Sequence, residues 1–594
     1  MKKKFLYKFK VNFKKFFFTF IFFSILSNYS LAANITGDNT ISSDSSTQQK
    51  FNADDTSLTI TGSSTLDRNT GQKPIHINEK SNGTVTIHSG SSAVGTANTI
   101  AGDDTTGLTV NNSGTITSTG SKAINLLDGT DASIVNNSGG IINSKTNAIS
   151  ISKNGTTPDN ITITNSGTIY TTNGSTNTIV FHSSATDSTV TNNSGGHIYN
   201  TSTSAVIVIG KDSTLTNSGK IENKQGPDEQ SIKLQGSGNT ITLKDGGIVI
   251  GTIKNSSSNT NTLKIQHGVG QGYFYETSGS GTFNLEDLDG NQIVQGSAGS
   301  VGQGGNETRD ELLGYKTHNI RKSLNRYKRN KNNLDETKGW GETFGSYIKR
   351  DQNNQNLALS YEFLNLGVNI INPLQNSDFI ISFETSRQDF TKDHSINHIG
   401  MLSGFNFYNL HSETFILGGV TLHNSERTIL TNTTTTGTLD IDDTYFSLKA
   451  MTGSELNNIK LIPDVGFTAG YEITPSHNES KYYSWGTKSI LNLSAYLEDE
   501  YNFQIINENN NLNLGWTIDY RKLIFGKEQD YKINNTSATY SQTDDLTQEL
   551  TFLINLGFDK KISNLGAFEF ALDGFYSTQE TSGLKGSINY TMEL

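Results

Sequence analysis

Residues 549–558 read E-L-T-F-L-I-N-L-G-F, and this stretch decides the fold of the C-terminal part of the chain. Apolar side chains stand at every second position from Leu550 to Phe558, and the same alternation recurs in residues 512–521, 568–573 and 587–594. A period of two gives a β-strand one apolar face and one polar face. A segment of about ten residues is long enough for a tilted strand to cross a bilayer. The pattern therefore predicts a transmembrane β-barrel whose apolar side chains face the lipid.

Twelve strands can be placed after residue 338, and twelve is even, as bacterial single-chain barrels require. Connections after odd-numbered strands are long and polar, and those after even-numbered strands are mostly short, as outer loops and periplasmic turns are. Residues 500–509 break this rule, because they make a long connection after an even-numbered strand. The predicted strands are 339–349, 357–371, 376–388, 397–410, 413–426, 439–453, 459–473, 485–499, 510–526, 546–560, 565–578 and 583–594.

The charged residues predicted to point into the barrel are mostly acidic. The basic ones among them are Lys449, Arg521 and Lys585, so the lumen should attract a basic segment of the chain. The inward acids are predicted to be Asp464, Glu472, Glu498, Asp519, Glu549, Glu569, Asp573 and Glu593. Candidates for the aromatic girdles of the barrel are Tyr471, Trp516, Tyr520, Tyr576 and Tyr590.

Residues 306–338 are predicted to be a linker that contains one α-helix. Residues 308–311 resemble a capping box, and apolar residues from Leu313 to Tyr327 recur at helical spacing. By itself such a helix would be an exposed linker with a solvated charged face. Next to an acidic lumen, it is predicted to thread the barrel. Its basic residues, which crowd the last turns, are Arg321, Lys322, Arg326, Lys328 and Arg329.

Residues 33–305 are predicted to form a β-helix, because a short phrase recurs in them. V-N-N-S-G-T-I stands at residues 110–116, and variants of it follow at 135–141, 163–169, 190–196 and 215–221. A nearly fixed period indicates stacked repeats. Each period holds two or three short β segments and no helical pattern, which favours one coil of a parallel β-helix. The glycines of the phrase, at 114, 139, 167, 195 and 219, are 25, 28, 28 and 24 residues apart.

The Asn-Ser-Gly part of each phrase is predicted to form the corner of a coil. Gly and Asn tolerate left-handed backbone angles, and stacked Asn side chains can form amide ladders. The polar segment 34–55 is a candidate N-terminal edge of the solenoid. The Gly-rich strip 296–305 is predicted to be a linker at its other end.

The first 32 residues have the pattern of a secretory signal peptide. Lysines fill the n-region, residues 16–26 form an apolar h-region, and small residues end at Ala32, the predicted cleavage position. The alternative is a membrane anchor, but spanning a bilayer takes about twenty apolar residues. The chain has no cysteine, which excludes a disulfide scaffold. Its net charge of −11 argues against a nucleic-acid partner.

Candidate catalytic or metal-binding residues are few. Asp54-Asp55 and Asp103-Asp104 are interpreted as solvated loop acids, and the isolated histidines of the repeats are interpreted in the same way: His76, His88, His182 and His197. His394 and His398 are interpreted as residues of a solvated outer loop without a third ligand. We therefore expect no catalytic residue, no metal site and no cofactor.

A signal peptide, β-helical repeats, one linker helix and a twelve-stranded barrel together resemble a monomeric (type Va) autotransporter over the whole chain. The most specific pieces are residues 339–347, similar to the family's first barrel strand, and residues 461–467, similar to its mid-barrel strand with Pro and Gly. The last strand is similar to the one that the barrel-assembly machinery recognises, although the family usually ends in Phe or Trp. The residues concerned are Gly586, Ile588, Tyr590, Met592 and Leu594.

The resemblance implies that the barrel is a translocator in the Gram-negative outer membrane and that it displays the upstream passenger on the cell surface. We expect the domains 1–32, 33–305, 306–338 and 339–594, which are signal peptide, passenger, linker with helix, and translocator. Expected partners are outer-membrane lipid, the barrel-assembly machinery, periplasmic chaperones and a host or sister-cell ligand, for a monomeric protein. Some relatives cut the passenger free within the lumen, at an Asn-Asn in the helix. Here Asn332-Asn333 follows the predicted helix and is interpreted as a neutral loop, with cleavage there as the lesser alternative.

Three functions stay open for the passenger and the barrel. A long face rich in Thr, Ser and Asn favours a non-enzymatic adhesin. The first alternative is a passenger with protease or esterase activity. The second is a simple outer-membrane porin, although a helix would fill most of a twelve-stranded lumen.

Overall fold

The structure is a computed structural model, and the residues that it describes are 32–172, 176–256, 258, 260–294, 298–300, 308–332, 337–351, 360–392, 394–408, 412–456, 463–480, 482–505, 509–533, 539–544, 547–562 and 566–593. The predicted signal peptide up to Leu31 lies outside the described residues, as do Asn333 and Leu594. The chain divides into two compact units. One is Met1–His267, Tyr275–Leu288 and Thr431–Thr438, and the other is Gly268–Phe274, Asp289–Leu430 and Leu439–Leu594.

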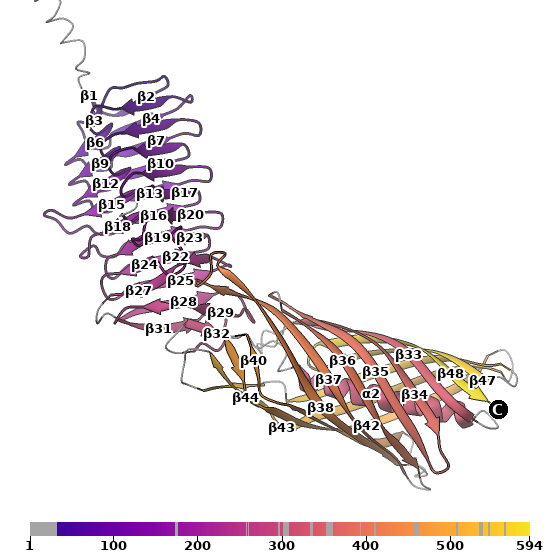
Figure 1. Ribbon diagram of the computed structural model, residues 1–594. Helices are drawn as coiled ribbons and strands as arrows, with labels where there is room; N and C mark the ends of the chain where they lie inside the picture. Colours follow the sequence, from indigo (N-terminus) through magenta and orange to yellow (C-terminus); the bar gives the residue numbers. More distant parts are fainter. Residues whose placement is uncertain are drawn as a thin grey trace, which may run out of the picture. The chain divides into compact units, whose positions relative to one another are not determined.

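The first unit contains the predicted parallel β-helix (Figure 1). Its coils place their strands in three parallel sheets, two of 11 strands and one of 8. Apolar residues at the same register position stack from coil to coil, as Val110 does on Val85 and Ile134. These side chains are fully buried, because the inward position of each strand faces the other sheets. The fold class predicted from the repeats is confirmed.

The strands of the three sheets follow in stacking order. The first sheet is β1 (Ala33–Ile35), β3 (Gln49–Phe51), β6 (Ile75–Asn78), β9 (Ile100–Asp103), β12 (Ile124–Leu127), β15 (Ile149–Ser152), β18 (Ile179–Phe181), β21 (Ile207–Ile209), β24 (Gln230–Leu234), β27 (Thr252–Asn255) and β30 (Thr277–Ser278). The second is β2 (Asp38–Ile41), β4 (Ser57–Ile60), β7 (Thr84–Ile87), β10 (Thr109–Asn112), β13 (Ser133–Asn136), β16 (Thr162–Asn165), β19 (Thr189–Asn192), β22 (Thr214–Asn217), β25 (Thr240–Lys244), β28 (Thr260–Gln266) and β31 (Thr282–Asp287). The third is β5 (Thr65–Arg68), β8 (Ser92–Gly95), β11 (Thr115–Ser118), β14 (Ile141–Ser144), β17 (Thr168–Thr171), β20 (His197–Asn200), β23 (Lys220–Asn223) and β26 (Ile248–Ile250).

An amide ladder runs along the corner between the second and third sheets. Each Asn side chain in it donates from Nδ2 to the Oδ1 of the next, and each of the four distances is 2.8 Å. The predicted ladder is therefore present, and burial makes it important, because an unpaired buried amide is costly. Its members, all buried, are Asn112, Asn136, Asn165, Asn192 and Asn217.

The glycines of the corners are needed for two different reasons, whereas the sequence predicted one. Gly139 and Gly195 do have positive φ, of 79° and 81°. In these two corners, the next glycine in the chain occupies the position that Gly114 and Gly167 occupy in their own corners. That position requires glycine for a different reason, because successive coils approach each other closely there. A Cβ on Gly114 would lie 2.2 Å from the Ser91 carbonyl oxygen, and one on Gly167 would lie 2.2 Å from that of Gly140. Only a residue without a side chain lets successive coils approach so closely.

The second unit contains the closed barrel of twelve antiparallel strands that the sequence predicts (Figure 1). The first and last strands close it by pairing with each other, so that Gly345 stands opposite Gly586. The strands are β33 (Thr337–Arg350), β34 (Tyr361–Pro373), β35 (Ser377–Phe390), β36 (His394–Tyr408), β37 (Ser412–Thr431), β38 (Thr438–Leu456), β39 (Asp464–Thr474), β42 (Lys488–Gln504), β43 (Asn510–Phe525), β46 (Gln548–Ile562), β47 (Gly566–Ser577) and β48 (Thr581–Glu593).

The exterior of the barrel is apolar and its interior is mixed. On β46, Leu550, Phe552 and Ile554 are 44–50% exposed, whereas the intervening Thr551 and Leu553 are at most 7% exposed. An exposed apolar face on every strand is the surface of a membrane-spanning barrel. Among the described residues, no helix is long and apolar enough to cross a membrane.

Two sequence-based boundaries need correction. Residues 500–504, predicted as part of a long connection, continue β42 and pair with β43, so that Tyr501 stands opposite Leu514. The connection is then short, and the alternation of long and short connections holds there too. In the Gly-rich strip 296–305, the described residues include β32 (Ala298–Ser300), where a plain linker is expected.

Candidate functional site: the helix-filled lumen and the faces of the β-helix

One long helix, α2 (Arg309–Asn332), lies inside the barrel. Its first turn is acidic and meets basic residues of the strands. Asp310 pairs with Arg521, and Glu311 accepts hydrogen bonds from Arg350 Nη1 at 3.0 Å and from Thr581 Oγ1 at 2.6 Å. The sequence suggested a capping role for Glu311 and did not anticipate these lumenal contacts. Negative charge in a first turn also suits the helix dipole.

In the middle of the helix, two of the predicted basic residues form ion pairs with the same acidic residue of the barrel wall. Arg321 Nη1 lies 2.5 Å from Glu498 Oε2, and Lys322 Nζ lies 2.8 Å from the same oxygen. The guanidinium of Arg321 also lies over the ring of Tyr496, 3.6 Å from its centroid. These contacts hold this side of the helix against β42, because Glu498 is buried and a buried charge is costly to leave unpaired.

The next turn of the helix contacts β33, the first strand of the barrel, and β47, the strand before the last. Arg326 binds Asp573 on β47 with both carboxylate oxygens at 2.6 Å, and its Nη1 lies 3.1 Å from Glu342 on β33. Lys585 of β48 lies 3.3 Å from Glu342 as well. The strands around the closure of the barrel are thereby joined to the helix through one buried charge network.

The last turns of the helix contact acids as well. Arg329 pairs with Glu569 and Glu500, and Asn330 Nδ2 donates to Glu569 at 3.1 Å. Lys328 Nζ lies 3.0 Å from Glu413 Oε2 but is 40% exposed, so its contact is the weakest of the set.

The predicted inward acids divide into three groups. Glu498, Glu569 and Asp573 bind α2 as described, Glu549 accepts from Tyr315 at 2.9 Å, and Asp519 lies 3.6 Å from His318. Glu472 is buried and lies 3.5 Å from Lys449 on the neighbouring strand. Asp464 is exposed, and the side chain of Glu593 lies outside the described part of the chain.

Sequence reasoning missed some lumenal acids that are as buried as those it predicted, among them Glu342 and Asp378. Glu342 is 1% exposed and Asp378 is also 1% exposed. The signal was available for Glu342, because it follows Trp340 by two positions and therefore shares its face of the strand. Tyr327 on the helix donates to Asp378 Oδ1 at 3.0 Å.

The helix also has an apolar stripe, which the sequence placed correctly at helical spacing. Leu313, Ile320, Leu324 and Tyr327 are each at most 3% exposed. They pack against inward apolar residues of the barrel wall: Trp340, Ile371, Ile380, Leu402, Phe415, Leu417, Met451, Ile490 and Leu523. Burial of this stripe adds hydrophobic stabilisation to the ion pairs on the other faces.

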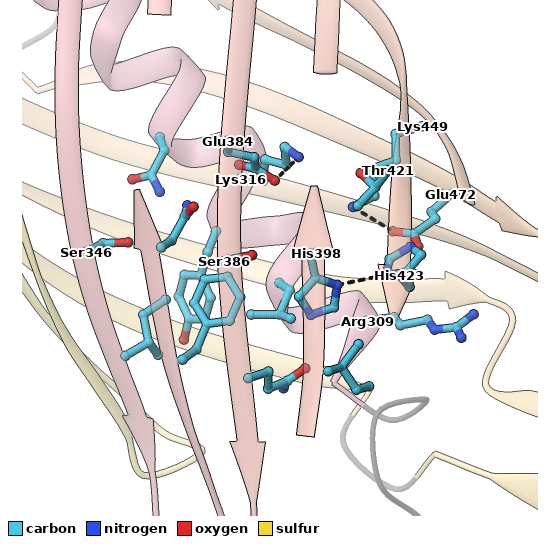
Figure 2. A pocket seen from close by; sticks show the side chains of 18 of the residues that line it. Arg309, Lys316, Ser346, Glu384, Ser386, His398, Thr421, His423, Lys449 and Glu472 are labelled. Carbon is cyan, nitrogen blue, oxygen red and sulfur yellow. Dashed lines mark hydrogen bonds and ion pairs between the residues drawn. The ribbon is translucent and has the colours of Figure 1, made fainter. Parts of the chain in front are cut away.

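Beside the start of the helix lies a small cavity of about 50 Å³ that is lined by both polar and apolar residues (Figure 2). That is room for one or two water molecules, each of which occupies about 30 Å³ in the liquid. Lys316 pairs with Glu384 in its wall, and Arg309 extends at one side of it. The helix therefore closes this part of the lumen.

The structure overturns the interpretation of two histidines. His394 and His398 are buried residues of β36 and not members of a solvated loop. His398 Nδ1 lies 2.7 Å from Nδ1 of His423 on β37 (Figure 2). His394 Nε2 lies 3.1 Å from Ser425 Oγ. The alternation of the strand turns both histidines inward, which the sequence could have shown once β36 began at His394.

In the β-helix, two histidines that the sequence left isolated bind carboxylates one coil further on. His76 Nε2 lies 3.1 Å from Asp103 Oδ2, and Lys73 pairs with the same carboxylate. The hydrogen bond from His76 holds the pKa of Asp103 below its usual value, although burial opposes this. His197 Nε2 lies 2.9 Å from Glu222, and burial holds the pKa of His197 below its usual value against the effect of that carboxylate.

The outward face of the second β-helix sheet carries two uncharged columns, which we call the hydroxyl face. Register pairing brings Thr162 beside Thr189 in one column and Thr164 beside Thr191 in the other. Adjacent strands lie about 4.8 Å apart, so the hydroxyl groups repeat at that spacing. The first column is Ser57, Thr84, Thr109, Ser133, Thr162, Thr189, Thr214 and Thr240, and the second is Thr59, Thr86, Asn111, Val135, Thr164, Thr191, Thr216 and Thr242.

A β-helix upstream of a membrane barrel whose lumen holds the connecting helix is the arrangement that the resemblance implies. The order of elements is therefore the one that the resemblance to a monomeric autotransporter implies. We use passenger as a label for residues 33–305 and translocator as a label for the barrel with α2.

No protein-family model matches the chain, and no curated protein matches it. Among solved structures, the chain is similar to the translocator domain of autotransporter NalP from Neisseria meningitidis, with 11% identity over 47% of this chain and 98% of that one and a TM-score of 0.31. It is also similar to the transport unit of autotransporter AIDA-I from Escherichia coli, with 9% identity over 44% and 91% and a TM-score of 0.29. The CymD monoaromatic hydrocarbon channel is matched too, with 10% identity over 44% and 89% and a TM-score of 0.26. Similarity at these identities and scores says nothing about function.

Proposed function

We propose that the translocator exports the passenger across the outer membrane and that the displayed passenger acts as an adhesive surface. The direction in which α2 runs through the lumen supports the export of the passenger. Its first residue, Arg309, donates to Thr474 at 2.6 Å, where β39 ends and a long connection begins. Near its end, Lys331 Nζ lies 3.3 Å from the hydroxyl of Tyr408, the last residue of β36 before a short turn. Long connections lie outside and short turns in the periplasm, so the chain upstream of α2 leaves on the outer side.

Protease treatment of intact cells tests display. Residues before about 305 should be degraded while the translocator survives, because the bilayer shields the barrel. A passenger that is degraded only after lysis contradicts the proposal. Export by this route also requires cleavage after Ala32 by signal peptidase, which the N-terminal sequence of the mature chain would reveal.

The hydroxyl face supports the adhesive part of the proposal. Each Thr or Ser hydroxyl both donates and accepts a hydrogen bond, and the two columns hold no charge from Ser57 to Thr242. Such a face suits a neutral partner surface on a host or sister cell, bound by many weak contacts. A passenger with enzymatic activity is the alternative, and cells that display it would then hydrolyse peptide or ester substrates.

Display on a non-adherent cell, followed by adhesion and autoaggregation assays, tests this part. Thr164→Lys with Thr191→Lys places two like charges on neighbouring coils of the hydroxyl face and should abolish adhesion. Thr168→Lys, on the outward face of the third sheet, is the matched control and should leave adhesion unchanged. Equal adhesion by all variants would show that the hydroxyl face does not bind the partner surface.

Assembly of the translocator requires partners that we infer from its terminal strand. We propose that periplasmic chaperones deliver the chain and that the barrel-assembly machinery reads β48, whose outward residues are Leu584, Gly586, Ile588, Tyr590 and Met592. The barrel closes on itself through β33 and β48, which is consistent with a monomer in the lipid bilayer.

A further inference from the structure

The third sheet of the β-helix carries an aromatic pair on its outward face. Residues 33–272 contain only two tyrosines, Tyr170 and Tyr199, and no tryptophan. β17 and β20 lie in successive coils (Figure 1), and their register places the two tyrosines side by side. The rings are stacked, with centroids 4.9 Å apart and an interplanar angle of 5°. The two phenylalanines of the same part of the chain, Phe51 and Phe181, are by contrast buried in the core.

One face of this pair is open. Tyr170 stands beside Asn143 of the preceding coil, and Tyr199 stands beside Glu222 of the following one. The Asn143 amide turns away from Tyr170, because its Nδ2 donates at 3.0 Å to the hydroxyl of Thr117, one coil further towards the N-terminus. An amide side chain is also shorter than a tyrosine ring. The outer part of the Tyr170 ring face therefore stands clear of its neighbour, and Tyr170 is partly exposed.

The opposite side of the pair is held in place by its neighbours. Lys224 Nζ lies 5.4 Å from the centroid of the Tyr199 ring and 2.7 Å from Glu222 Oε2. The ring of His197, tilted against that of Tyr199, has its centroid 4.6 Å away. These contacts restrict the Tyr199 ring, and the stack in turn restricts Tyr170. A ligand that stacks on the open face therefore meets a surface that is already ordered.

The surroundings of the pair are basic, although the whole chain carries a net charge of −11. Lys220 Nζ lies 3.0 Å from the same Glu222 oxygen that binds Lys224, so one carboxylate faces two ammonium groups. Lys145, which is exposed, directly follows β14 in the coil before Tyr170. Positive charge thus lies at both ends of the aromatic pair, and its complement is an anionic ligand.

Hydroxyl groups lie between the two ends. Lys145, Thr172, Thr201 and Lys224 each directly follow their strands, which are β14, β17, β20 and β23, so they form one column. Thr172 and Thr201 lie two positions after the tyrosines and therefore share their face of the sheet. Each hydroxyl can donate and accept a hydrogen bond. Neighbouring strands lie about 4.8 Å apart, so the column is about 14 Å long, which suits a chain of several small polar units.

We propose that this face binds an acidic saccharide, with a carboxylate-bearing pyranose ring stacked on Tyr170. One side of a pyranose ring presents C–H groups, which carry slight positive charge and are attracted to the negative face of an aromatic ring. The carboxylate pairs with Lys145, and the sugar hydroxyls bind Thr172 and Thr201. We call the site the tyrosine platform, and its residues are Asn143, Lys145, Tyr170, Thr172, Tyr199, Thr201 and Lys224.

The tyrosine platform is independent of the proposed export, and it lies on a different sheet from the hydroxyl face. Its bland alternative is a cross-strand aromatic pair that only stabilises the β-helix. The two roles differ in what they predict. A purely structural pair affects the melting temperature of the passenger and binds nothing, whereas the platform binds a saccharide that contains both the ring and the charge.

Binding of immobilised oligogalacturonate to the full chain in detergent, measured by biolayer interferometry, tests the platform. Oligogalacturonate is a chain of pyranose rings that each carry a carboxylate. Neutral galactose oligomers keep the rings without the charge, and polyglutamate keeps the carboxylates without the rings. We expect both of these probes to bind at least about tenfold more weakly than oligogalacturonate. Absence of oligogalacturonate binding, or equal binding of polyglutamate, would overturn the proposal.

Substitutions locate the site. Tyr170→Ala should weaken oligogalacturonate binding about tenfold, whereas Tyr170→Phe, which keeps the ring face, should stay within about twofold. Lys145→Gln should weaken binding as well, and its matched control is Lys50→Gln, at an exposed position of β3 on the first sheet. Circular dichroism melts verify that each passenger is folded, and if Tyr170→Ala does not fold, the Lys145 and Lys50 variants decide. Unchanged affinity in Tyr170→Ala or Lys145→Gln would show that the saccharide does not bind at the tyrosine platform.

Discussion

Arg326 of the lumenal helix donates from one nitrogen, Nη2, to both carboxylate oxygens of Asp573 on β47, each at 2.6 Å. Both side chains are buried, and they are separated by 247 residues of sequence. The pair therefore joins the helix to the barrel wall beside the strand that closes the barrel. A buried charge that loses its partner lowers the stability of the fold, so substitution of either residue should be strongly destabilising.

Arg326→Glu should loosen the helix in the lumen. Removing one partner of a buried ion pair costs about 3–5 kcal/mol, and the new carboxylate would also face Glu342. We expect a lower thermal stability of the barrel and a higher conductance in planar bilayers, most clearly when Arg321 and Lys328 are replaced by Glu as well. Lys328→Glu alone, at a 40% exposed position, is the control and should change stability by about 1 kcal/mol or less. A conductance equal to that of the unsubstituted protein would mean that the helix stays in place without its ion pairs.

Deletion of residues 583–594 should abolish assembly of the barrel. β48 pairs with β33 on one side and β47 on the other, so its loss leaves two unpaired edges in the membrane. The measurement is heat-modifiable migration of the membrane fraction. Replacement of Leu584 by Ile, which keeps the outward apolar side chain, serves as the control. Normal migration of the deletion variant would show that the terminal strand is dispensable.

Asn112→Ala should destabilise the passenger far more than Asn111→Ala. The two residues are neighbours on β10, but Asn112 lies in the buried amide ladder and Asn111 points outward. Loss of one buried ladder member leaves the next amide without its partner, at a cost of about 1–3 kcal/mol. Denaturant unfolding of the passenger, followed by circular dichroism, compares the two. Equal midpoints would show that the ladder adds little to stability.

The passenger should lose stability as the pH falls, in two steps. The pKa of His197 is lowered in the folded state by burial, so the unfolded chain binds its proton first and stability declines below about pH 6.5. The pKa of Asp103 is lowered by His76, so its contribution is complete above about pH 3.9 and is lost as the pH falls further.

Melting temperatures of the passenger at a series of pH values measure this dependence. His197→Phe should remove the upper step, and Asp103→Asn should reduce the lower one, to which Glu222 also contributes because its pKa is lowered in the folded state. His182→Gln, at an exposed position, should leave the profile unchanged. A His197→Phe profile that still declines near pH 6 would assign the upper step to another group.

Much of the fold could be predicted from short-range patterns. The alternation in residues 549–558 predicted β46 and its outward face, and the recurrence of Asn-Ser-Gly predicted both the coils and the amide ladder. The helical spacing of Leu313 and Tyr327 predicted the apolar face of α2. Each of these features depends on residues a few positions apart, whose geometry is set by the local backbone.

The candidate site was predicted only in part, for a physical reason. Sequence alternation shows that Glu498 and Asp573 face inward, but which basic residue each one meets depends on the tilt and register of strands on opposite sides of the barrel. The same global geometry buries His398 against His423 and brings Glu311 to Arg350.

The sequence by itself determined the two kinds of β structure, the position of the helix between them and the charge of its last turns, since period and composition act locally. The tertiary structure decided which charges pair, how little space the helix leaves beside its first turns, and that two long connections, after β39 and after β43, form a sheet with a core of its own. Those features arise where segments distant in sequence meet, because burial and pairing energies depend on what stands opposite each residue.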